Sequence, residues 1–324
     1  MNVRTAQRLA VLTLALAAVL PAPRPEVRAE QGQPAGRRMA LTFDDLPYVR
    51  IGDVAYMPAA SRVTSSLMKT LGAYSAPAIG FVNEAQLAPA GERDARINLL
   101  RQWIDQGMIL GNHTYSHPDF NAVTIERFQE EILKGEVQTR RLARPGTPLF
   151  FRHPMTHTGN TREKKEAIEK FLTARGYIIA PHTIENSDFI FNAVYVRAQT
   201  SKDAALARRL GDAYLDYTIA ATEFAETVSP KIFGREIPQT LLLHANDINA
   251  DNLDAVLKRL QTRGYRFITL EEAMADPAYR TTDTLVTDYG PTWLWRWTKS
   301  LGLTISFAAD PDVPAWVTAL FKTS

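Results

Sequence analysis

Two adjacent carboxylates end an apolar run near the start of the chain. The run covers residues 39–43, and Asp44 and Asp45 follow it directly. Two like charges this close resist ionising together unless cations offset their repulsion. Residues 46–48 do not begin a helical pattern, which disfavours a role for the pair as a helix N-cap. The pair therefore indicates a site that holds positive charge.

A pair of histidines supplies further candidate metal ligands. His113 and His117 are four residues apart, so one helical or turn-like segment can direct both imidazoles to one point. Two histidines and a carboxylate leave coordination positions open, and Asp45 is the natural third ligand. Asp44 can then accept a proton from water that the metal has acidified. Alone, the histidine spacing more often reflects a turn cap beside Pro118, but the tandem aspartates favour the metal site.

Apolar runs alternate with amphipathic stretches along most of the chain. We expect strands over residues 39–43, 78–82, 108–110, 149–151, 177–180, 239–244 and 266–269. We expect helices over residues 60–74, 94–106, 124–142, 162–175, 202–228 and 252–263. This alternation predicts a mainly parallel α/β sheet wrapped by helices, with a barrel as the expected arrangement. Catalytic groups gather at the carboxyl ends of strands in such folds. The candidate residues, together with Arg152 and His244, follow or end predicted strands.

Composition excludes several classes of protein and site. The 324 residues are 45% hydrophobic and 22% charged, which is ordinary for a globular protein. The formal net charge is only +2, and no basic stripe with interleaved aromatics occurs, so nucleic-acid binding is not expected. The chain has no cysteine, so a metal site must use His, Asp or Glu.

Four motifs resemble, in their order along the chain, those of polysaccharide deacetylases with a NodB-homology domain (carbohydrate esterase family 4). They are Thr42-Phe43-Asp44-Asp45, His113-Thr114-x-x-His117, Arg152-x-Pro154 and Leu242-x-His244. The resemblance covers residues 39–275. It implies a deformed (β/α) barrel that binds a divalent metal, most often Zn²⁺, and removes acetyl groups from a sugar amide or ester. Asp45, His113 and His117 correspond to the metal ligands.

The same resemblance implies roles for the residues around the metal. Asp44 corresponds to the catalytic base, and Arg152 would hold it ionised and oriented. His244 corresponds to the general acid, and Asp188 to a carboxylate that pairs with this histidine and favours its protonated form. The metal and a backbone N–H near Tyr48 would receive the oxyanion charge.

Three departures from the family pattern bear on the substrate. Leu46 stands where the family usually has glycine, and its side chain is expected to narrow or reshape the cleft. Phe189 stands where tryptophan is usual. The third motif is lengthened and contains His153 and His157, which we expect to contact substrate or to lie in a loop. A second metal site there is the alternative, although the proline between them disfavours a helical turn.

The two ends of the chain differ in composition from the middle. Arg4 and Arg8 precede an apolar run over 9–20, which predicts a signal peptide over 1–29 and a linker over 30–38. An exported protein, periplasmic or secreted, with no stable membrane span after cleavage is then expected; a retained anchor is the alternative. Residues 276–324 form an extension with three tryptophans in 293–297. We expect a helix that covers the barrel with Trp293 and Trp297 on one face, with a sugar-stacking or partner-binding segment as the alternative.

The leading expectation is therefore an exported, metal-dependent deacetylase that hydrolyses N-acetyl groups of a glycan such as peptidoglycan or a chitin-like polymer. An O-acetyl esterase acting on xylan-like material, or a hydrolase of small amides, would use the same residues. A non-catalytic glycan-binding protein is the remaining alternative, but binding alone does not require Asp44 or His244.

Overall fold

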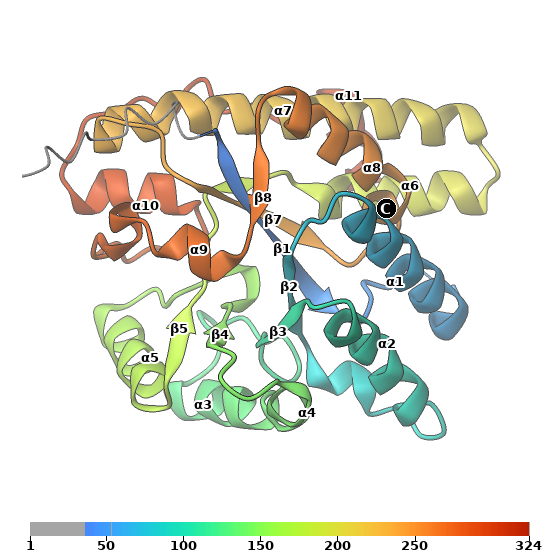
Figure 1. The fold of residues 1–324 in the computed structure, drawn as a ribbon, viewed down its shortest axis with the longest axis horizontal. Coiled ribbons are helices and arrows are strands. Elements are labelled where there is room, and N and C mark those ends of the chain that lie inside the picture. Colours follow the sequence, from blue (N-terminus) through green and yellow to red (C-terminus); the bar gives the residue numbers. More distant parts are fainter. Residues whose placement is uncertain (1–35, 53, 324) are drawn as a thin grey trace, which may run out of the picture. The chain divides into compact units, whose positions relative to one another are not determined.

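The structure, a computed structural model, describes residues 36–52 and 54–323, which belong to one compact unit. A curled sheet of parallel strands lies at its centre, and helices pack around it (Figure 1). The strands are β1 (Arg38–Leu46), β2 (Ala78–Val82), β3 (Ile109–Asn112), β4 (Leu149–Phe151), β5 (Tyr177–Ile179), β6 (Ile184–Glu185), β7 (Gln239–His244) and β8 (Arg266–Ile268). Their order is β5-β4-β3-β2-β1-β7-β6, and β8 pairs with β1. The predicted α/β fold of the deformed-barrel type is confirmed, and in the described residues no pairing joins β5 to β6.

Most helices occupy the connections between strands, as the alternating pattern predicts, and α9, α10 and α11 follow the last strand. They are α1 (Tyr56–Ala73), α2 (Arg93–Asp105), α3 (Ile125–Lys134), α4 (Val137–Leu142), α5 (Arg162–Ala174), α6 (Asp188–Thr200), α7 (Ala204–Phe233), α8 (Asp247–Thr262), α9 (Leu270–Met274), α10 (Trp293–Ser300) and α11 (Ala315–Lys322). The helix predicted over 124–142 is two helices, which separate at Gly135. The short strand β6 and helix α6 were not predicted.

Strand β1 shows how the sequence places its side chains. Leu41 and Phe43 pack against the helices, where the Phe43 ring lies 5.4 Å from that of Trp103 in α2. Ala40 belongs instead to the separate core inside the curled sheet. Because side chains alternate along a strand, Thr42 and Asp44 share the face of Ala40. Asp44 therefore lies at the carboxyl end of the interior face.

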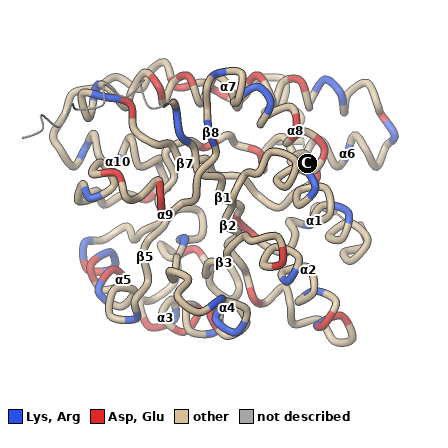
Figure 2. Tube along the Cα trace, viewed as in Figure 1, with Lys and Arg blue, Asp and Glu red and all other residues tan. Residues whose placement is uncertain are grey.

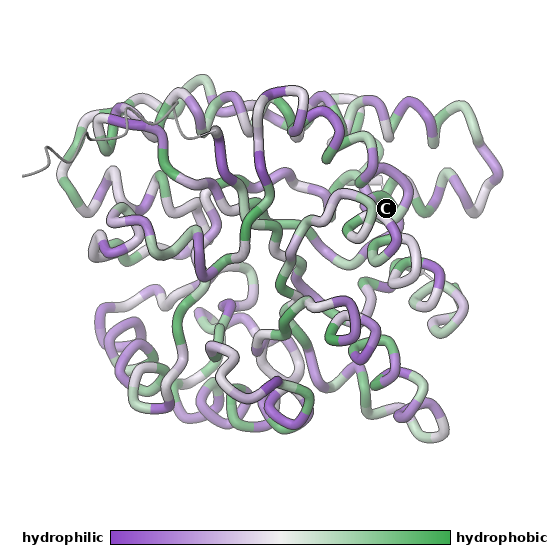
Figure 3. The backbone as a smooth tube through the Cα atoms, viewed as in Figure 1, coloured by the Kyte–Doolittle hydropathy of each residue, from purple (hydrophilic) through white to green (hydrophobic). Residues whose placement is uncertain are grey.

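Polar and apolar residues separate between the helices and the sheet. The strands are mostly green in the hydropathy colouring of Figure 3, and most charged residues lie on helices and loops in Figure 2. Among the described residues, no helix has the length and hydropathy needed to cross a membrane. The signal peptide predicted over 1–29 lies outside the described residues.

The C-terminal extension packs onto the same unit through α10. The Trp297 side chain is 1% exposed, and its ring lies 5.5 Å from Phe233 and 5.3 Å from Tyr279. The backbone N–H of Trp293 donates to the backbone carbonyl of His182, in the connection between β5 and β6, at 2.8 Å. Trp293 and Trp297 are both buried, which confirms the predicted covering helix. This helix therefore lies against the connection between β5 and β6.

Candidate active site

The carboxyl ends of the strands surround a cavity of about 430 Å³. Register explains part of this convergence, because Asp44 of β1 is directly paired with His244 of β7. Five residues predicted from the sequence line the cavity, namely Asp44, Asp45, His113, His117 and His244. The other two predicted residues, Arg152 and Asp188, are fully buried and do not line it.

Asp45, His113 and His117 converge on one point. Asp45 Oδ1 lies 3.5 Å from His113 Nε2 and 3.5 Å from His117 Nε2. Two ligand atoms bound at about 2.1 Å to one tetrahedral ion would lie about 3.4 Å apart, so this spacing suits a shared cation. Within the described part of the chain, no other group of three or more acidic or histidine residues has metal-binding geometry.

The surroundings of these side chains also fit a divalent metal. His113 Nδ1 lies 2.7 Å from the backbone carbonyl of Arg152, so Nδ1 carries the proton and Nε2 keeps its lone pair for a ligand bond. Burial, with a smaller contribution from the charge of His117, holds the pKa of His113 well below its ordinary value. Asp45 Oδ1 is buried and has no hydrogen-bond partner in the described residues. A neutral imidazole and a partnerless carboxylate oxygen are what a cation requires.

The backbone at this site adopts conformations that L-residues rarely do. The φ angles are +63° at Asp45, +68° at Thr114 and +57° at His117. Such conformations cost about 1–3 kcal/mol each and persist only where surrounding contacts hold them. The Thr114 N–H donates to Asn112 Oδ1 at 2.7 Å, and the His117 N–H donates to Thr114 Oγ1 at 3.1 Å. These bonds hold residues 113–117, here called the histidine loop, in the conformation that directs both imidazoles toward Asp45.

Asp44 lies next to this group, and its Oδ2 is 3.7 Å from His113 Nε2. Its side chain is almost fully buried, and Oδ1 has no hydrogen-bond partner in the described residues. Burial raises the pKa of Asp44, and the charges of Arg152 and His244 only partly oppose this effect. Arg152 donates to Thr42 Oγ1 at 3.0 Å, and no ion pair joins it to Asp44 in the described residues. Arg152 thus acts on Asp44 through its charge, and the orienting role stays a prediction.

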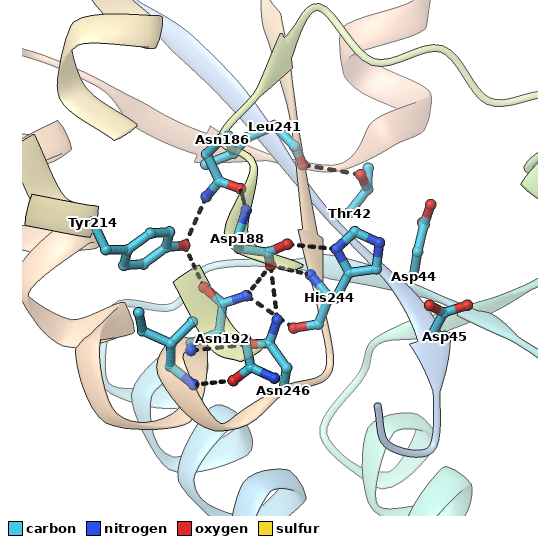
Figure 4. Close-up of polar contacts among 12 residues, drawn as sticks. Thr42, Asp44, Asp45, Asn186, Asp188, Asn192, Tyr214, Leu241, His244 and Asn246 are labelled. Carbon is cyan, nitrogen blue, oxygen red and sulfur yellow. Dashed lines mark hydrogen bonds and ion pairs between the residues drawn. The ribbon is translucent and has the colours of Figure 1, made fainter. Parts of the chain in front are cut away.

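His244, which lines the cavity, forms a close pair with the buried Asp188 (Figure 4). His244 Nδ1 lies 2.6 Å from Asp188 Oδ1, and the backbone N–H of His244 donates to Asp188 Oδ2 at 2.8 Å. The side-chain amides of Asn246 and Asn249 also donate to Oδ2. Burial lowers the pKa of His244, but the carboxylates of Asp188 and the tandem aspartates outweigh it and raise the pKa to about 10. The imidazole is therefore protonated at neutral pH.

Asp188 itself is held ionised. Burial raises its pKa, but the charge of His244 and the hydrogen bonds it accepts outweigh burial, so the net pKa is lower than usual. In Figure 4, His244 lies between Asp188 and the two aspartates of β1. The pair thus presents a proton donor toward the cavity.

The expectation that Leu46 reshapes the cleft was wrong. Leu46 is fully buried and does not line the cavity. Its side chain packs over Gly80 in β2, where a Cβ would lie 2.3 Å from Leu46 Cδ2. Gly80, which has no side chain, therefore leaves space on β2 for the side chain of Leu46. Phe189, which is 44% exposed, does line the cavity, together with Met155.

The two additional histidines lie outside the cavity and belong to different surroundings. His153 is buried against the ring of Phe151, with centroids 4.9 Å apart, and burial holds its pKa well below the ordinary value. His157 Nδ1 lies 2.7 Å from Asp119 Oδ1. Neither histidine belongs to a metal-binding group in the described residues.

Two cavity residues were missed by the sequence reasoning. Glu185 ends the two-residue strand β6, which is too short to give a periodic signal. Gly290 comes from the C-terminal extension, which no motif links to the site. Only the neighbouring Asn186-Ser187-Asp188 segment gave a hint that Glu185 lies close by.

Comparison with known proteins finds both sequence and structural relatives. Residues 31–174 match the sequence model of a family described as polysaccharide deacetylase. A peptidoglycan-N-acetylglucosamine deacetylase from Bacillus cereus is 24% identical over 239 residues. The match covers 72% of this chain and 66% of that protein, slightly less than two thirds of its length.

Two solved structures show more distant likeness. A family 4 carbohydrate esterase from Streptomyces lividans, in complex with acetate, is 19% identical with a TM-score of 0.47, over 74% of this chain and 96% of that one. A pseudoenzyme of the same family from Bacillus anthracis is 15% identical with a TM-score of 0.48, over 75% of this chain and 67% of that one.

Proposed function

We propose that this chain, of which residues 31–174 match the polysaccharide deacetylase family, is a metal-dependent hydrolase that removes N-acetyl groups from a glycan such as peptidoglycan or a chitin-like polymer. One observation carries the proposal: a single cavity presents a metal-binding group, the Asp44 carboxylate with an oxygen free of hydrogen bonds within the described residues, and the protonated imidazole of His244. Amide hydrolysis needs an activated water, stabilisation of negative charge on the carbonyl oxygen, and a proton for the leaving nitrogen.

The metal would be held by Asp45, His113 and His117, and we propose Zn²⁺. When bound, such an ion supplies Lewis-acid chemistry, which acidifies water and stabilises negative charge on oxygen. The three protein groups keep their donor atoms directed at one point, because Arg152 fixes the His113 tautomer and the loop hydrogen bonds fix His117. This preorganisation is the contribution of the chain itself.

Proton transfer would fall to Asp44 and His244. Asp44 accepts a proton from the attacking water, whose oxygen bonds to the acetyl carbonyl carbon. The carbon–nitrogen bond then breaks, acetate leaves, and His244 donates its proton to the sugar nitrogen. Asp188 keeps His244 protonated before the reaction and oriented during it. The proton that Asp44 gains offsets the one that His244 loses, so one water is consumed for each acetate released.

The test is acetate release by the purified protein from a panel of substrates, with and without a chelator. We expect release from an N-acetylated chito-oligosaccharide or a peptidoglycan fragment, loss of release with chelator, and recovery on addition of Zn²⁺. Release from acetylated xylan alone would identify an esterase, and turnover of small amides alone an amide hydrolase. Glycan binding without any release would contradict catalysis.

We also propose that the protein acts outside the cytoplasm. The proposal rests on the basic start and the apolar run over 9–20, which are typical of a signal peptide. Cell fractionation followed by N-terminal sequencing tests it. Export with a new N-terminus near residue 30 is expected, whereas an intact N-terminus in the membrane fraction would indicate a retained anchor.

A further inference from the structure

A second cavity, of about 410 Å³, adjoins the candidate active site. Glu185 and Gly290 line both cavities, so the two are neighbours. Helix α7 supplies one wall, and residues 289–311 of the C-terminal extension supply most of the remainder. The extension is held close to the active site, since a Cβ at Gly290 would lie 2.1 Å from the backbone oxygen of Met155. The extension thus completes a binding space that the strands alone do not form.

The lining of this cavity combines aromatic rings with carboxylates. The aromatic residues are Tyr217, Phe224, Tyr289, Trp295 and Phe307, and the acidic residues are Glu185 and Asp310. Phe307 organises the aromatic wall, with its ring 4.8 Å from Trp295 and 5.4 Å from Phe224. No Lys, Arg or His of the described residues lines the cavity. The cavity therefore attracts positive charge and offers flat apolar faces.

Glu185 stands out because its carboxylate has no partner. It is partly buried between the two cavities, and no hydrogen bond or ion pair involves its side chain in the described residues. Burial raises the pKa of Glu185 to about 7; the charge of His244 opposes this, and those of Asp188 and Asp310 reinforce it. Ionising a carboxylate in such surroundings is unfavourable unless a cation accompanies it. A positively charged ligand group would supply that partner.

We propose that this second cavity binds an amino sugar with a free, protonated amine, next to the acetylated sugar in the active site. The inference rests on the proposed function and extends it, because the enzyme then prefers glycans that are already partly deacetylated. Ammonium groups pair with carboxylates and with aromatic faces. Aromatic rings also offer apolar area to the faces of sugar rings. An acidic glycan, such as one with peptide carboxylates, would be repelled by Glu185 and Asp310.

A binding experiment tests the cavity without reference to catalysis. Calorimetry compares a glucosamine trimer with cellotriose, which has hydroxyl groups in place of the amines. We expect the wild-type protein to bind the glucosamine trimer about tenfold more tightly, equivalent to about 1.4 kcal/mol. Asp310→Asn should remove most of this preference. Equal affinity for the two trimers in the wild-type protein would overturn the inference.

A matched control makes the same charge change outside the cavity, on α7. Asp216 is exposed, lies next to Tyr217 in sequence and does not line the cavity. Asp216→Asn should keep the wild-type preference for the glucosamine trimer. An equal loss in Asp216→Asn and Asp310→Asn would mean that only long-range charge matters, which contradicts a specific cavity. Asp310 is also exposed, so its replacement should not affect folding.

A kinetic experiment separates this inference from the proposed function. The ratio of kcat/KM for partly deacetylated over fully acetylated chito-oligosaccharide should be about tenfold in the wild-type protein and near one in Glu185→Gln. Equal turnover of both substrates by the wild type would overturn the inference and leave the proposed function standing. No acetate from either glycan would overturn the proposed function. Faster turnover of a mono-acetylated linear diamine than of either glycan would place the amine on a small amide and contradict the amino-sugar assignment.

Discussion

Asp44 and Asp45 are neighbours in sequence but belong to different surroundings. Strand alternation places Asp44 on the interior face, within reach of the Arg152 and His244 charges. The left-handed backbone at Asp45, with φ of +63°, breaks that alternation and brings its carboxylate to the two histidines. One carboxylate can therefore bind a cation while the other remains available for a proton. The sequence revealed the pair, but not the backbone turn that separates their roles.

The division of roles predicts different effects for the two aspartates. Asp44→Asn should lower kcat by about 10²–10⁴, the usual contribution of a general base, while bound metal stays near one per chain. Asp45→Asn should lose both activity and metal. Acetate release and elemental analysis measure the two quantities. Asp119→Asn, outside the cavity, is the matched control, and loss of metal in Asp44→Asn would contradict the assignment.

The pair of Asp188 and His244 predicts a pH effect. His244 must be protonated to act as an acid, so activity should fall as the pH rises through its pKa, which Asp188 helps raise to about 10. In Asp188→Asn this support is lost and burial lowers the pKa, so the alkaline limb of the kcat profile should move to lower pH. At neutral pH, we expect kcat of Asp188→Asn to be lower than that of the wild type by about 10²-fold or more. An unchanged limb would show that another residue is the acid.

At the scale of elements, apolar runs predicted most strands. Contacts with distant segments determine the elements that were not predicted. β2, β4 and β7 have the predicted bounds because each is a continuous buried run with clear ends. β6 was missed because two residues give no period. α6 was missed because it is buried on several faces, by α7, α8 and α11, and so lacks a polar stripe.

Gly135 shows how an element boundary supports the site. It separates α3 from α4, and a Cβ there would lie 2.4 Å from the backbone carbon of Thr114 in the histidine loop. Gly135→Ala should therefore destabilise the protein by about 1–3 kcal/mol and weaken metal binding. Gly72→Ala, in α1, is the control: its nearest contact is 3.5 Å, and it should be neutral or stabilising by less than about 1 kcal/mol.

Urea unfolding and zinc titration measure the two effects of Gly135→Ala. A variant that keeps wild-type metal affinity while losing stability would show that the close contact supports only the helices. Equal behaviour of the two glycine variants would contradict the role of the Thr114 contact altogether.

At the scale of the whole molecule, the C-terminal extension is part of the core as well as of the second cavity. Trp297 is 1% exposed between Phe233 and Tyr279, whereas Trp295 is only partly buried. Trp297→Ala should cost about 3–5 kcal/mol of unfolding free energy, as expected for a fully buried tryptophan. Trp295→Ala should cost less than half as much. Urea unfolding followed by circular dichroism compares them, and an equal cost would contradict the separation of the two faces of α10.

The motifs predicted the metal-binding group because its residues lie in short, ordered segments of the chain. They did not predict the second cavity, because Glu185, Tyr217 and Phe307 share no local pattern. These residues come together only when α7 and the extension pack beside β6. Long-range packing of this kind leaves no periodic signal in the sequence.

The pairing of β1 with β7 has a consequence for how the chain acquires its structure. One neighbour of the first strand is supplied by Gln239–His244, about two hundred residues later. Contacts between such distant segments form slowly, and synthesis proceeds from the N-terminus. Until the seventh strand has been made, the central strand has an open edge, and Asp44 lacks the histidine beside it. A ribosome-bound nascent chain should therefore stay incompletely folded, and inactive, until most of it has been translated.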